Sequence, residues 1–249
     1  MPPPALRFAG VGKRYGRSVA LDDLTLEVRH GECFGLVGVN GAGKTTLIKC
    51  LLDFCDMDAG SIDIYGVPHR EERARAALAF LPERFNPPYY LTGRDFIAFV
   101  LSLQGTPYVP AAVHARLAAL DLDPAALARP VRTYSKGMTQ KLGLAACLAA
   151  RKDLYVLDEP TSGLDPRARA RLKAELQRLR AEGHTVFFTS HALADVAEMC
   201  DRMALVHAGR LRFAGTPAEL ATRYGAADLE RAFLACVDEA EAVGASIPA

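Results

Sequence analysis

The chain has 249 residues, of which 50% are hydrophobic and 24% charged, a composition typical of a globular protein that buries a substantial core. Its formal net charge of +1 provides no general attraction to nucleic acid or anionic lipid. No run approaches the ~20 apolar residues that a bilayer-spanning helix needs. The first residues, Met-Pro-Pro-Pro-Ala-Leu-Arg, lack the apolar core of a signal peptide. We therefore expect a cytoplasmic protein whose membrane role, if it has one, comes through a partner.

The cysteines are scattered along the chain, and none forms a C-x-x-C pair. Most of them have apolar neighbours. Buried reduced thiols are therefore favoured over a disulfide framework or a metal site. The cysteines are Cys33, Cys50, Cys55, Cys147, Cys200 and Cys236.

The N-terminal region predicts antiparallel strands. Leu6–Ala9 and Leu24–Val28 have strand-forming composition, and the second alternates with a period of two. Asp22-Asp23 supplies residues typical of a turn. Tyr15, which lies between the two strands, has two open interpretations. It is either an aromatic residue at a strand edge or a ring that stacks on a nucleotide base.

The most informative segment is the glycine-rich run Gly38–Thr46. It connects the apolar run Cys33–Val37, which predicts a buried strand, with apolar residues at helical spacing. The run matches the G-x-x-x-x-G-K-[ST] pattern, in which backbone N–H groups and a helix N-terminus surround a phosphate chain. Lys44 supplies a mobile positive charge, and the Thr45 hydroxyl can reach Mg²⁺. The residues predicted to hold the nucleotide here are Gly38, Asn40, Gly41, Ala42, Gly43, Lys44, Thr45 and Thr46.

Helical patterns dominate from Thr92 to about Ala150, where we expect a helical subdomain inserted into an α/β core. The strand pattern resumes with Leu154–Leu157, whose unbroken apolar run predicts burial on both faces. A helix rich in Arg and Lys follows. Because acidic residues interrupt its cations, a solvated helix face is favoured over a nucleic-acid contact. The segment Val186–Thr189 predicts the next strand.

Two acids, Asp158 and Glu159, follow the predicted strand Leu154–Leu157. The carboxyl ends of core strands are where open α/β sheets bind ligands, so both acids are expected beside the phosphate loop. Asp158 can hold a metal ion, and Glu159 can orient and deprotonate a water molecule. His191 follows the next strand and is predicted to contact the γ-phosphate.

A second anion site is predicted at Ser135 and Gly137, which open a helix. One chain has no evident need for two phosphate sites. The second site is therefore expected to serve a neighbouring molecule.

These motifs, in this order, resemble the nucleotide-binding ATPase subunits of ABC transporters over nearly all of residues 5–220. The resemblance implies a P-loop NTPase (RecA-like) α/β core with an N-terminal antiparallel β subdomain and an inserted α-helical subdomain. It divides a single ATPase domain into a core of 1–88 and 151–224, a helical subdomain of 89–150 and a C-terminal tail of 225–249. For that tail, a final packing helix is favoured over a dimer contact.

The resemblance also implies a head-to-tail dimer, either a homodimer or a pair with a similar ATPase, that closes on two ATP molecules with Mg²⁺. Lys44, Glu159 and His191 would act in catalysis, and Tyr15 would stack on adenine. Thr45, Glu83 and Asp158 would hold the metal. The γ-phosphate would be covered from the opposite subunit by Ser135, Lys136 and Gly137.

Two departures from the family pattern are informative. Glu83 stands where the family usually has Gln, and the signature reads Tyr-Ser-Lys-Gly-Met rather than Leu-Ser-Gly-Gly-Gln. Both variants look like the branch whose permeases are ABC-2 type exporters. The segment Asn86–Gly93 is then either the docking site for a separate membrane permease or a link that fixes the helical subdomain to the core.

The expected function is an ATP-hydrolysing motor that is peripheral to the cytoplasmic face of a bacterial inner or plasma membrane and attached only through its permease. An importer ATPase, a soluble cassette acting on ribosomes or nucleic acid, and a regulatory module that binds ATP without hydrolysis are the alternatives. Direct contact with nucleic acid is not expected.

Overall fold

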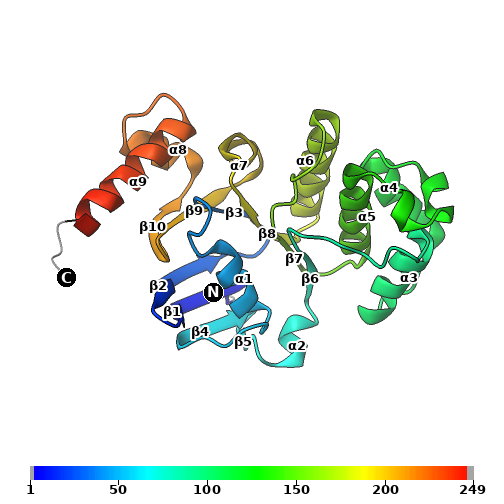
Figure 1. The fold of residues 1–249 in the computed structure, drawn as a ribbon, viewed down its shortest axis with the longest axis horizontal. Helices are drawn as coiled ribbons and strands as arrows, with labels where there is room; N and C mark the ends of the chain where they lie inside the picture. The colour runs from blue at the N-terminus through cyan, green and yellow to red at the C-terminus, as the bar shows by residue number, and fades with distance from the viewer. Residues whose placement is uncertain (1–2, 246–249) are drawn as a thin grey trace.

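The structure, a computed structural model, describes residues 3–245 and consists of two β-sheets flanked by helices (Figure 1). The smaller sheet is antiparallel with the strand order β2-β1-β4-β5, and the larger has the order β10-β9-β3-β8-β7-β6. The strands are β1 (Leu6–Tyr15), β2 (Ser18–Val28), β3 (Cys33–Val37), β4 (Ala59–Ile64), β5 (Val67–Pro68), β6 (Leu78–Leu81), β7 (Leu154–Leu157), β8 (Thr185–Ser190), β9 (Arg202–His207) and β10 (Arg210–Gly215).

The helices lie around and between these sheets. Helices α3–α5 are at one end of the molecule, and α8 and α9 are at the opposite end (Figure 1). Their bounds are α1 (Lys44–Leu51), α2 (Glu72–Arg75), α3 (Gly93–Leu103), α4 (Pro110–Ala119), α5 (Lys136–Ala149), α6 (Pro166–Ala181), α7 (Leu193–Met199), α8 (Pro217–Arg223) and α9 (Leu229–Ala245), with 3-10 turns at Pro124–Ala128 and Val131–Thr133.

The N-terminal strands are longer than the sequence predicts, and the predicted turn at Asp22-Asp23 is wrong. Both residues lie inside β2, where the β1–β2 register shifts between Val11 and Lys13. Asp23 has a φ of 53°, as expected for an extra residue accommodated in a β-bulge. The chain reverses instead at Gly16, whose φ of 59° suits glycine.

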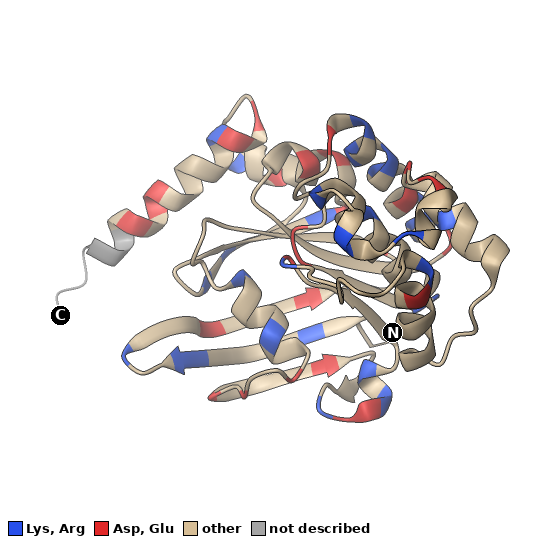
Figure 2. Cartoon of the chain, turned by 45° about the vertical axis from the view of Figure 1, so that its right-hand side comes forward, with Lys and Arg blue, Asp and Glu red and all other residues tan. Residues whose placement is uncertain are grey.

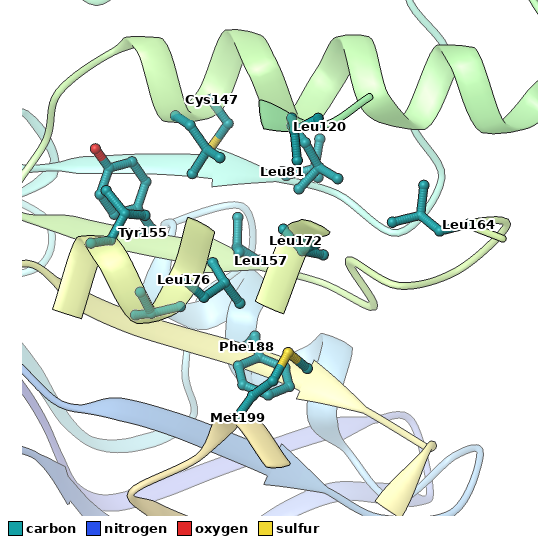
Figure 3. Close-up of a cluster of buried hydrophobic side chains, with 14 of the residues drawn as sticks. Leu81, Leu120, Cys147, Tyr155, Leu157, Leu164, Leu172, Leu176, Phe188 and Met199 are labelled. Carbon is teal, nitrogen blue, oxygen red and sulfur yellow. The ribbon is translucent and has the colours of Figure 1, made fainter. Parts of the chain in front are cut away.

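The larger sheet is parallel apart from β10, and its central strands are buried on both faces. Along β7, Leu154 and Val156 enter the core that contains α1, whereas Tyr155 and Leu157 enter the core beneath α5 and α6. Figure 3 shows part of this second core. The prediction that Leu154–Leu157 is buried on both faces is confirmed, because each face of the strand has its own layer of apolar partners.

The helical end of the molecule is built from α3, α4 and α5 with the two 3-10 turns. Thr92 caps α3 and Ser135 caps α5, each accepting a hydrogen bond from a backbone N–H three residues on. Helix α5 packs on α3, α4 and strand β6, so its long buried face joins this end to the larger sheet.

The cations of α6 are largely committed to ion pairs. Lys173 pairs with Glu198, Arg180 with Asp201, and Arg178 with two carboxylates on its own helix. Figure 2 accordingly shows blue and red segments mixed over this part of the molecule. The pairing matches the predicted solvated face.

At the C-terminus, α9 lies against α7, α8 and β9. Ala232 and Cys236 are buried in the same hydrophobic core as Tyr155 and Leu157. Helix α9 therefore acts as a packing helix along the part that the structure describes. The predicted tail extends to residue 249, and its last four residues lie outside the described range. Within residues 3–245, no helix has both the length and the apolarity needed to cross a bilayer.

Candidate functional site

The phosphate loop connects β3 with α1, as the sequence predicts. Two of its glycines, Gly38 and Gly43, are required by close contacts with other backbone segments. A Cβ atom on Gly38 would come within 2.3 Å of the Val206 carbonyl oxygen in β9, and one on Gly43 within 2.6 Å of the Ala20 carbonyl oxygen. Gly43 also has a φ of 112°, which L-residues rarely adopt. The loop is therefore held in place by the two sheets that it lies between.

Lys44 is the buried cation of this loop. Its ammonium group donates to the carbonyl oxygen of Gly38 at 2.6 Å and to that of Val39 at 3.3 Å. Burial lowers the pKa of Lys44, while the carboxylates of Glu159, Asp158 and Glu83 oppose that shift. A phosphate that binds to the loop would meet an ammonium group that is already held in position.

A cleft of about 440 Å³ opens above the loop. Its lining brings together phosphate-loop residues with side chains that follow β6, β7 and β8, although these segments are far apart in the sequence. The lining residues are Ala20, Asn40, Gly41, Ala42, Gly43, Lys44, Thr45, Thr46, Glu83, Arg84, Asp158, Glu159 and His191.

Asp158 follows strand β7 directly and is almost fully buried beside the loop. The hydroxyl of Thr189, on the neighbouring strand β8, donates to its Oδ1 at 2.6 Å. Burial raises the pKa of Asp158, and the hydrogen bond from Thr189 opposes the shift. The burial cost of this carboxylate would fall if a cation were bound next to it.

Glu159 is also buried, and its carboxylate is paired with the imidazole ring of His191. The distance between Glu159 Oε2 and His191 Nδ1 is 2.8 Å. The backbone of Glu159 is left-handed, with a φ of 50°, and its N–H donates to Thr189 Oγ1 at 2.9 Å. Non-glycine residues in this conformation are strained by about 1–2 kcal/mol and occur at functional sites. His191 is 65% exposed at the side chain, so its ring faces the open cleft.

The residues around the cleft fit a magnesium ion bound together with phosphates. Within residues 3–245, no cluster of three or more His, Cys, Asp or Glu side chains could hold a metal alone. Mg²⁺ does not need such a cluster, because it typically uses one or two carboxylates, water and phosphate oxygens. Asp158, Glu83 and the exposed Thr45 hydroxyl line one cleft and are oxygen donors of the right kind.

Tyr15 ends β1 outside the phosphate cleft. It is 50% exposed, and its hydroxyl donates to the Cys55 sulfur at 3.7 Å. The hydrogen bond to Cys55 raises the pKa of the Tyr15 hydroxyl, and the side chain of Thr46, which lines the cleft, opposes that shift. The ring is therefore exposed close to the phosphate loop, a position compatible with either interpretation of this residue.

The signature residues lie apart from the cleft. Ser135 and Lys136 are exposed at the start of α5, and none of Ser135, Lys136 and Gly137 lines the phosphate pocket. Ser135 Oγ accepts a hydrogen bond from Met138 N at 3.2 Å. Gly137 faces the loop after Glu159, where an added Cβ would be 3.3 Å from the Gly163 carbonyl oxygen. The two predicted anion sites are therefore separate within one chain.

Sequence reasoning missed three residues of this region. Thr189 was interpreted only as a strand residue, although it contacts both Asp158 and Glu159. Arg84 adds a cation to the cleft next to Glu83. Gln140, buried in α5, donates to the Pro160 carbonyl oxygen at 3.2 Å and so joins the signature helix to the loop after Glu159. The polar side chain of Thr189 at the end of an apolar strand is the signal that could have identified it.

Comparisons with known proteins agree with this arrangement. The sequence profile of the ABC transporter family matches residues 21–162, more than half of the chain. Nod factor export ATP-binding protein I of Ralstonia nicotianae is 36% identical over 225 residues, covering 88% of this chain and 69% of that protein. The protein of the same name from Paraburkholderia xenovorans is 36% identical, with 88% and 73% covered. An uncharacterized ABC transporter ATP-binding protein of a Nostoc species is 38% identical over 211 residues, with 81% and 61% covered.

Solved structures give the same result at the level of the fold. The ATP-binding subunit of an ABC transporter superposes with a TM-score of 0.84 at 28% identity, covering 93% of this chain and 99% of that one. A dimeric ATP-binding cassette in a post-hydrolysis state, bound to ADP and Pi, has a TM-score of 0.77 at 18% identity, with 85% and 98% covered. The chain belongs to the ABC transporter family as an ATP-binding subunit with the fold of its ATPases.

Proposed function

We propose that the chain is the ATP-hydrolysing motor of an exporter. The observation that supports hydrolysis best is the arrangement of Asp158, Glu159 and His191 beside the phosphate loop. The carboxylate of Glu159 is largely buried and is paired with His191. It lines the same cleft as Lys44. A regulatory module that only binds ATP would not need this base.

Each residue has a distinct role in this proposal. Lys44 exchanges its two carbonyl partners for oxygens of the β- and γ-phosphates and stabilises their charge. Glu159 orients a water molecule toward the γ-phosphorus and accepts its proton. His191 holds the Glu159 carboxylate in position and faces the γ-phosphate. Asp158, Thr45 and Glu83 would hold Mg²⁺, which would neutralise negative charge on the phosphates when it is bound.

The separate position of the signature residues supports a head-to-tail dimer. Ser135, Lys136 and Gly137 have no phosphate to bind within their own chain, because they lie outside its cleft. Placed over the cleft of a second copy, the N-terminus of α5 would add N–H groups, the Ser135 hydroxyl and the Lys136 charge to the γ-phosphate. Loss of that phosphate would let the two copies separate.

The exposed tyrosines after β6 support a protein partner at Asn86–Gly93. Tyr89 and Tyr90 are 69% and 70% exposed, and their rings contact each other at a centroid distance of 5.6 Å rather than inserting into the core. This exposure favours docking of a membrane permease over a link to the core. The names of two relatives, which are export ATP-binding proteins, support export as the direction. The chain would then be peripheral to the membrane, on its cytoplasmic face.

The central experiment is Glu159→Gln, which removes the proton acceptor but keeps the size of the side chain. ATP turnover should fall by about 10²–10⁴-fold while ATP binding survives, and the variant should accumulate as an ATP-bound dimer. Turnover, nucleotide affinity and mass by light scattering are measured with Mg-ATP. Glu182→Gln, an exposed change at the end of α6, is the matched control. Unchanged turnover in Glu159→Gln would rule out the assigned base.

A further inference from the structure

All six cysteines are free, and two of them are in contact beside Tyr15. The sulfur atoms of Cys50 and Cys55 are 3.6 Å apart. Cys50 is buried in α1, and Cys55 is half-buried in the loop that follows. The chain reverses between them, with Asp53 at a φ of 61° and Phe54 N donating to the Lys49 carbonyl oxygen at 2.8 Å. This reversal brings the second thiol back over the first.

The same pair of thiols is linked to the nucleotide site. The Tyr15 hydroxyl donates to Cys55 Sγ at 3.7 Å. That bond raises the pKa of the hydroxyl, and the nearby side chain of Thr46, which lines the phosphate cleft, opposes the shift. On the other side, the Lys13 ammonium lies 5.4 Å from the centre of the Tyr15 ring and is paired with Asp58. The position of the Tyr15 ring thus depends on the sulfur of Cys55.

We propose that Cys50 and Cys55 form a reversible redox site, oxidised to a disulfide by hydroperoxides, that weakens nucleotide binding by releasing Tyr15. The disulfide follows from the geometry of the two thiols. The effect on nucleotide binding rests on the proposed stacking of Tyr15 on adenine.

The accessible thiol reacts first. The Cys55 thiolate attacks one peroxide oxygen, the O–O bond breaks, and a sulfenic acid forms with release of hydroxide. The Cys50 sulfur then attacks the Cys55 sulfur and displaces the oxygen of the sulfenic acid. That oxygen leaves as water, together with the proton of the Cys50 thiol. The balance is two thiols and one hydrogen peroxide to one disulfide and two waters. Burial raises the pKa of Cys50 to about 12, so this thiol resolves the intermediate rather than starting the reaction.

Oxidation moves the sulfur that accepts the hydrogen bond from Tyr15. The two sulfur atoms would have to close from 3.6 Å to the bonded distance of about 2.05 Å, which draws Cys55 toward α1. The Tyr15 hydroxyl then loses the hydrogen bond that fixes its ring. A single weak hydrogen bond contributes modestly, so we expect the affinity for ATP to fall by about two- to fivefold.

The other cysteines provide an internal control. Cys33 and Cys200 form a second neighbouring pair, in which Cys33 is almost fully buried and burial raises the pKa of Cys200 well above its usual value. Burial therefore disfavours the thiolate of Cys200 and keeps Cys33 away from solvent. That pair should stay reduced under the conditions that oxidise Cys50 and Cys55.

The experiment treats the full chain with hydrogen peroxide, blocks the remaining thiols by alkylation and maps the cysteines by mass spectrometry after trypsin digestion. Cys50 and Cys55 fall on one tryptic peptide, residues 50–70, because the chain has no Lys or Arg between Lys49 and Arg70. A disulfide therefore appears as this peptide without its two alkyl groups and lighter by two hydrogens. Cys33 and Cys200 lie on separate peptides and should both be alkylated.

Binding of a fluorescent ATP analogue is measured before oxidation, after it and after reduction with dithiothreitol. We expect weaker binding on oxidation and recovery on reduction. Cys55→Ser and Cys50→Ser should abolish the response. Tyr15→Phe keeps the ring but lacks the hydroxyl, so its affinity should no longer change on oxidation.

The outcomes separate the two proposals. Alkylation of both thiols after peroxide, or conversion of Cys55 to sulfinic acid without a disulfide, overturns the redox site. A disulfide with unchanged affinity overturns its link to Tyr15. Failure of the reduced chain to bind nucleotide contradicts the proposed function instead, and leaves disulfide formation as a separate result.

Discussion

The two regions that we propose to bind phosphate differ in how completely one copy builds them. Around Lys44 the side chains are buried and hydrogen-bonded to one another, and they line one cleft before any nucleotide is present. At Ser135 the side chains are exposed and bound only to their own helix end. The first region is preorganised for a ligand within the chain, whereas the second presents its donors to the outside. This difference is what the proposed head-to-tail dimer requires, since a second copy would complete the second region.

The largest expected effect concerns the preorganised region. Lys44→Ala removes a buried ammonium that would make two charge-assisted hydrogen bonds to phosphates. ATP affinity should fall by about 10²–10⁴-fold, measured by titration with a fluorescent analogue. Lys49→Ala, which removes an exposed lysine from the same helix, should bind normally. Normal affinity in the Lys44 variant would contradict the assignment of this cleft to nucleotide.

The exposed region should affect turnover but not binding. Ser135→Arg places a large cation where a second copy would dock, so hydrolysis should fall by about 10²-fold through loss of transition-state stabilisation. The ATP affinity of the monomer should be unchanged. Turnover and affinity are compared with those of Ala118→Arg, which adds the same side chain on the exposed face of α4.

Mixing variants sharpens this test. A dimer of one Ser135→Arg chain and one Lys44→Ala chain has one site with both defects and one site with none. Partial recovery of hydrolysis on mixing is expected if Lys44 and Ser135 act across the interface. Residues that act within one chain would give no recovery.

A smaller effect is expected from the residue proposed to stack on the adenine base. Tyr15→Ala should weaken ATP binding by about tenfold or more, since base–aromatic stacking contributes about 1–3 kcal/mol. The affinity for inorganic triphosphate, which has no base, should not change. Equal losses for both ligands would favour the interpretation of Tyr15 as a strand-edge aromatic.

The smallest effect is on stability and follows from the raised pKa of Asp158. Because the folded state holds this proton more tightly than the unfolded state, the ionised carboxylate destabilises the nucleotide-free fold above its folded pKa, and the penalty disappears below the unfolded pKa. Asp158→Asn, which can still accept from Thr189, should therefore raise the free energy of unfolding at neutral pH by about 1 kcal/mol. The gain should shrink as the pH falls.

Urea unfolding at neutral and acidic pH measures this difference. Asp165→Asn is the control of opposite sign, because a hydrogen bond from Ala168 N lowers the pKa of Asp165. That variant should show no gain at neutral pH. A stability gain for Asp158→Asn that is equal at both pH values would mean that burial of its charge is not the cause.

Most of the fold was predictable where the pattern is local. The loop at Lys44 carries its own signature, and the apolar run Leu154–Leu157 predicts its two buried faces. The turn at Asp22-Asp23 was predicted wrongly because the bulge there is set by pairing with β1, which turn composition does not reveal. Local composition also ended the first strand at Ala9 instead of Tyr15 and began the second at Leu24 instead of Ser18.

The supporting residues of the site were harder to predict for the same reason. Thr189 meets Asp158 only because β7 and β8 are neighbours with Leu157 opposite Phe188. Gln140 meets Pro160 only because α5 packs against the loop after Glu159. Such contacts depend on strand order and helix docking, which a single sequence does not specify.

The two hydrogen bonds from Lys44 to the carbonyl oxygens of Gly38 and Val39 affect how nucleotide enters. These bonds make the ammonium group an internal ligand of the loop. Nucleotide entry is thus an exchange in which phosphate oxygens replace peptide oxygens around one nitrogen. The measured affinity for nucleotide reports the free-energy difference between Lys44 bound to phosphate and Lys44 bound to the two carbonyl oxygens. Weaker bonds to the carbonyls would therefore tighten nucleotide binding without any new contact to the nucleotide.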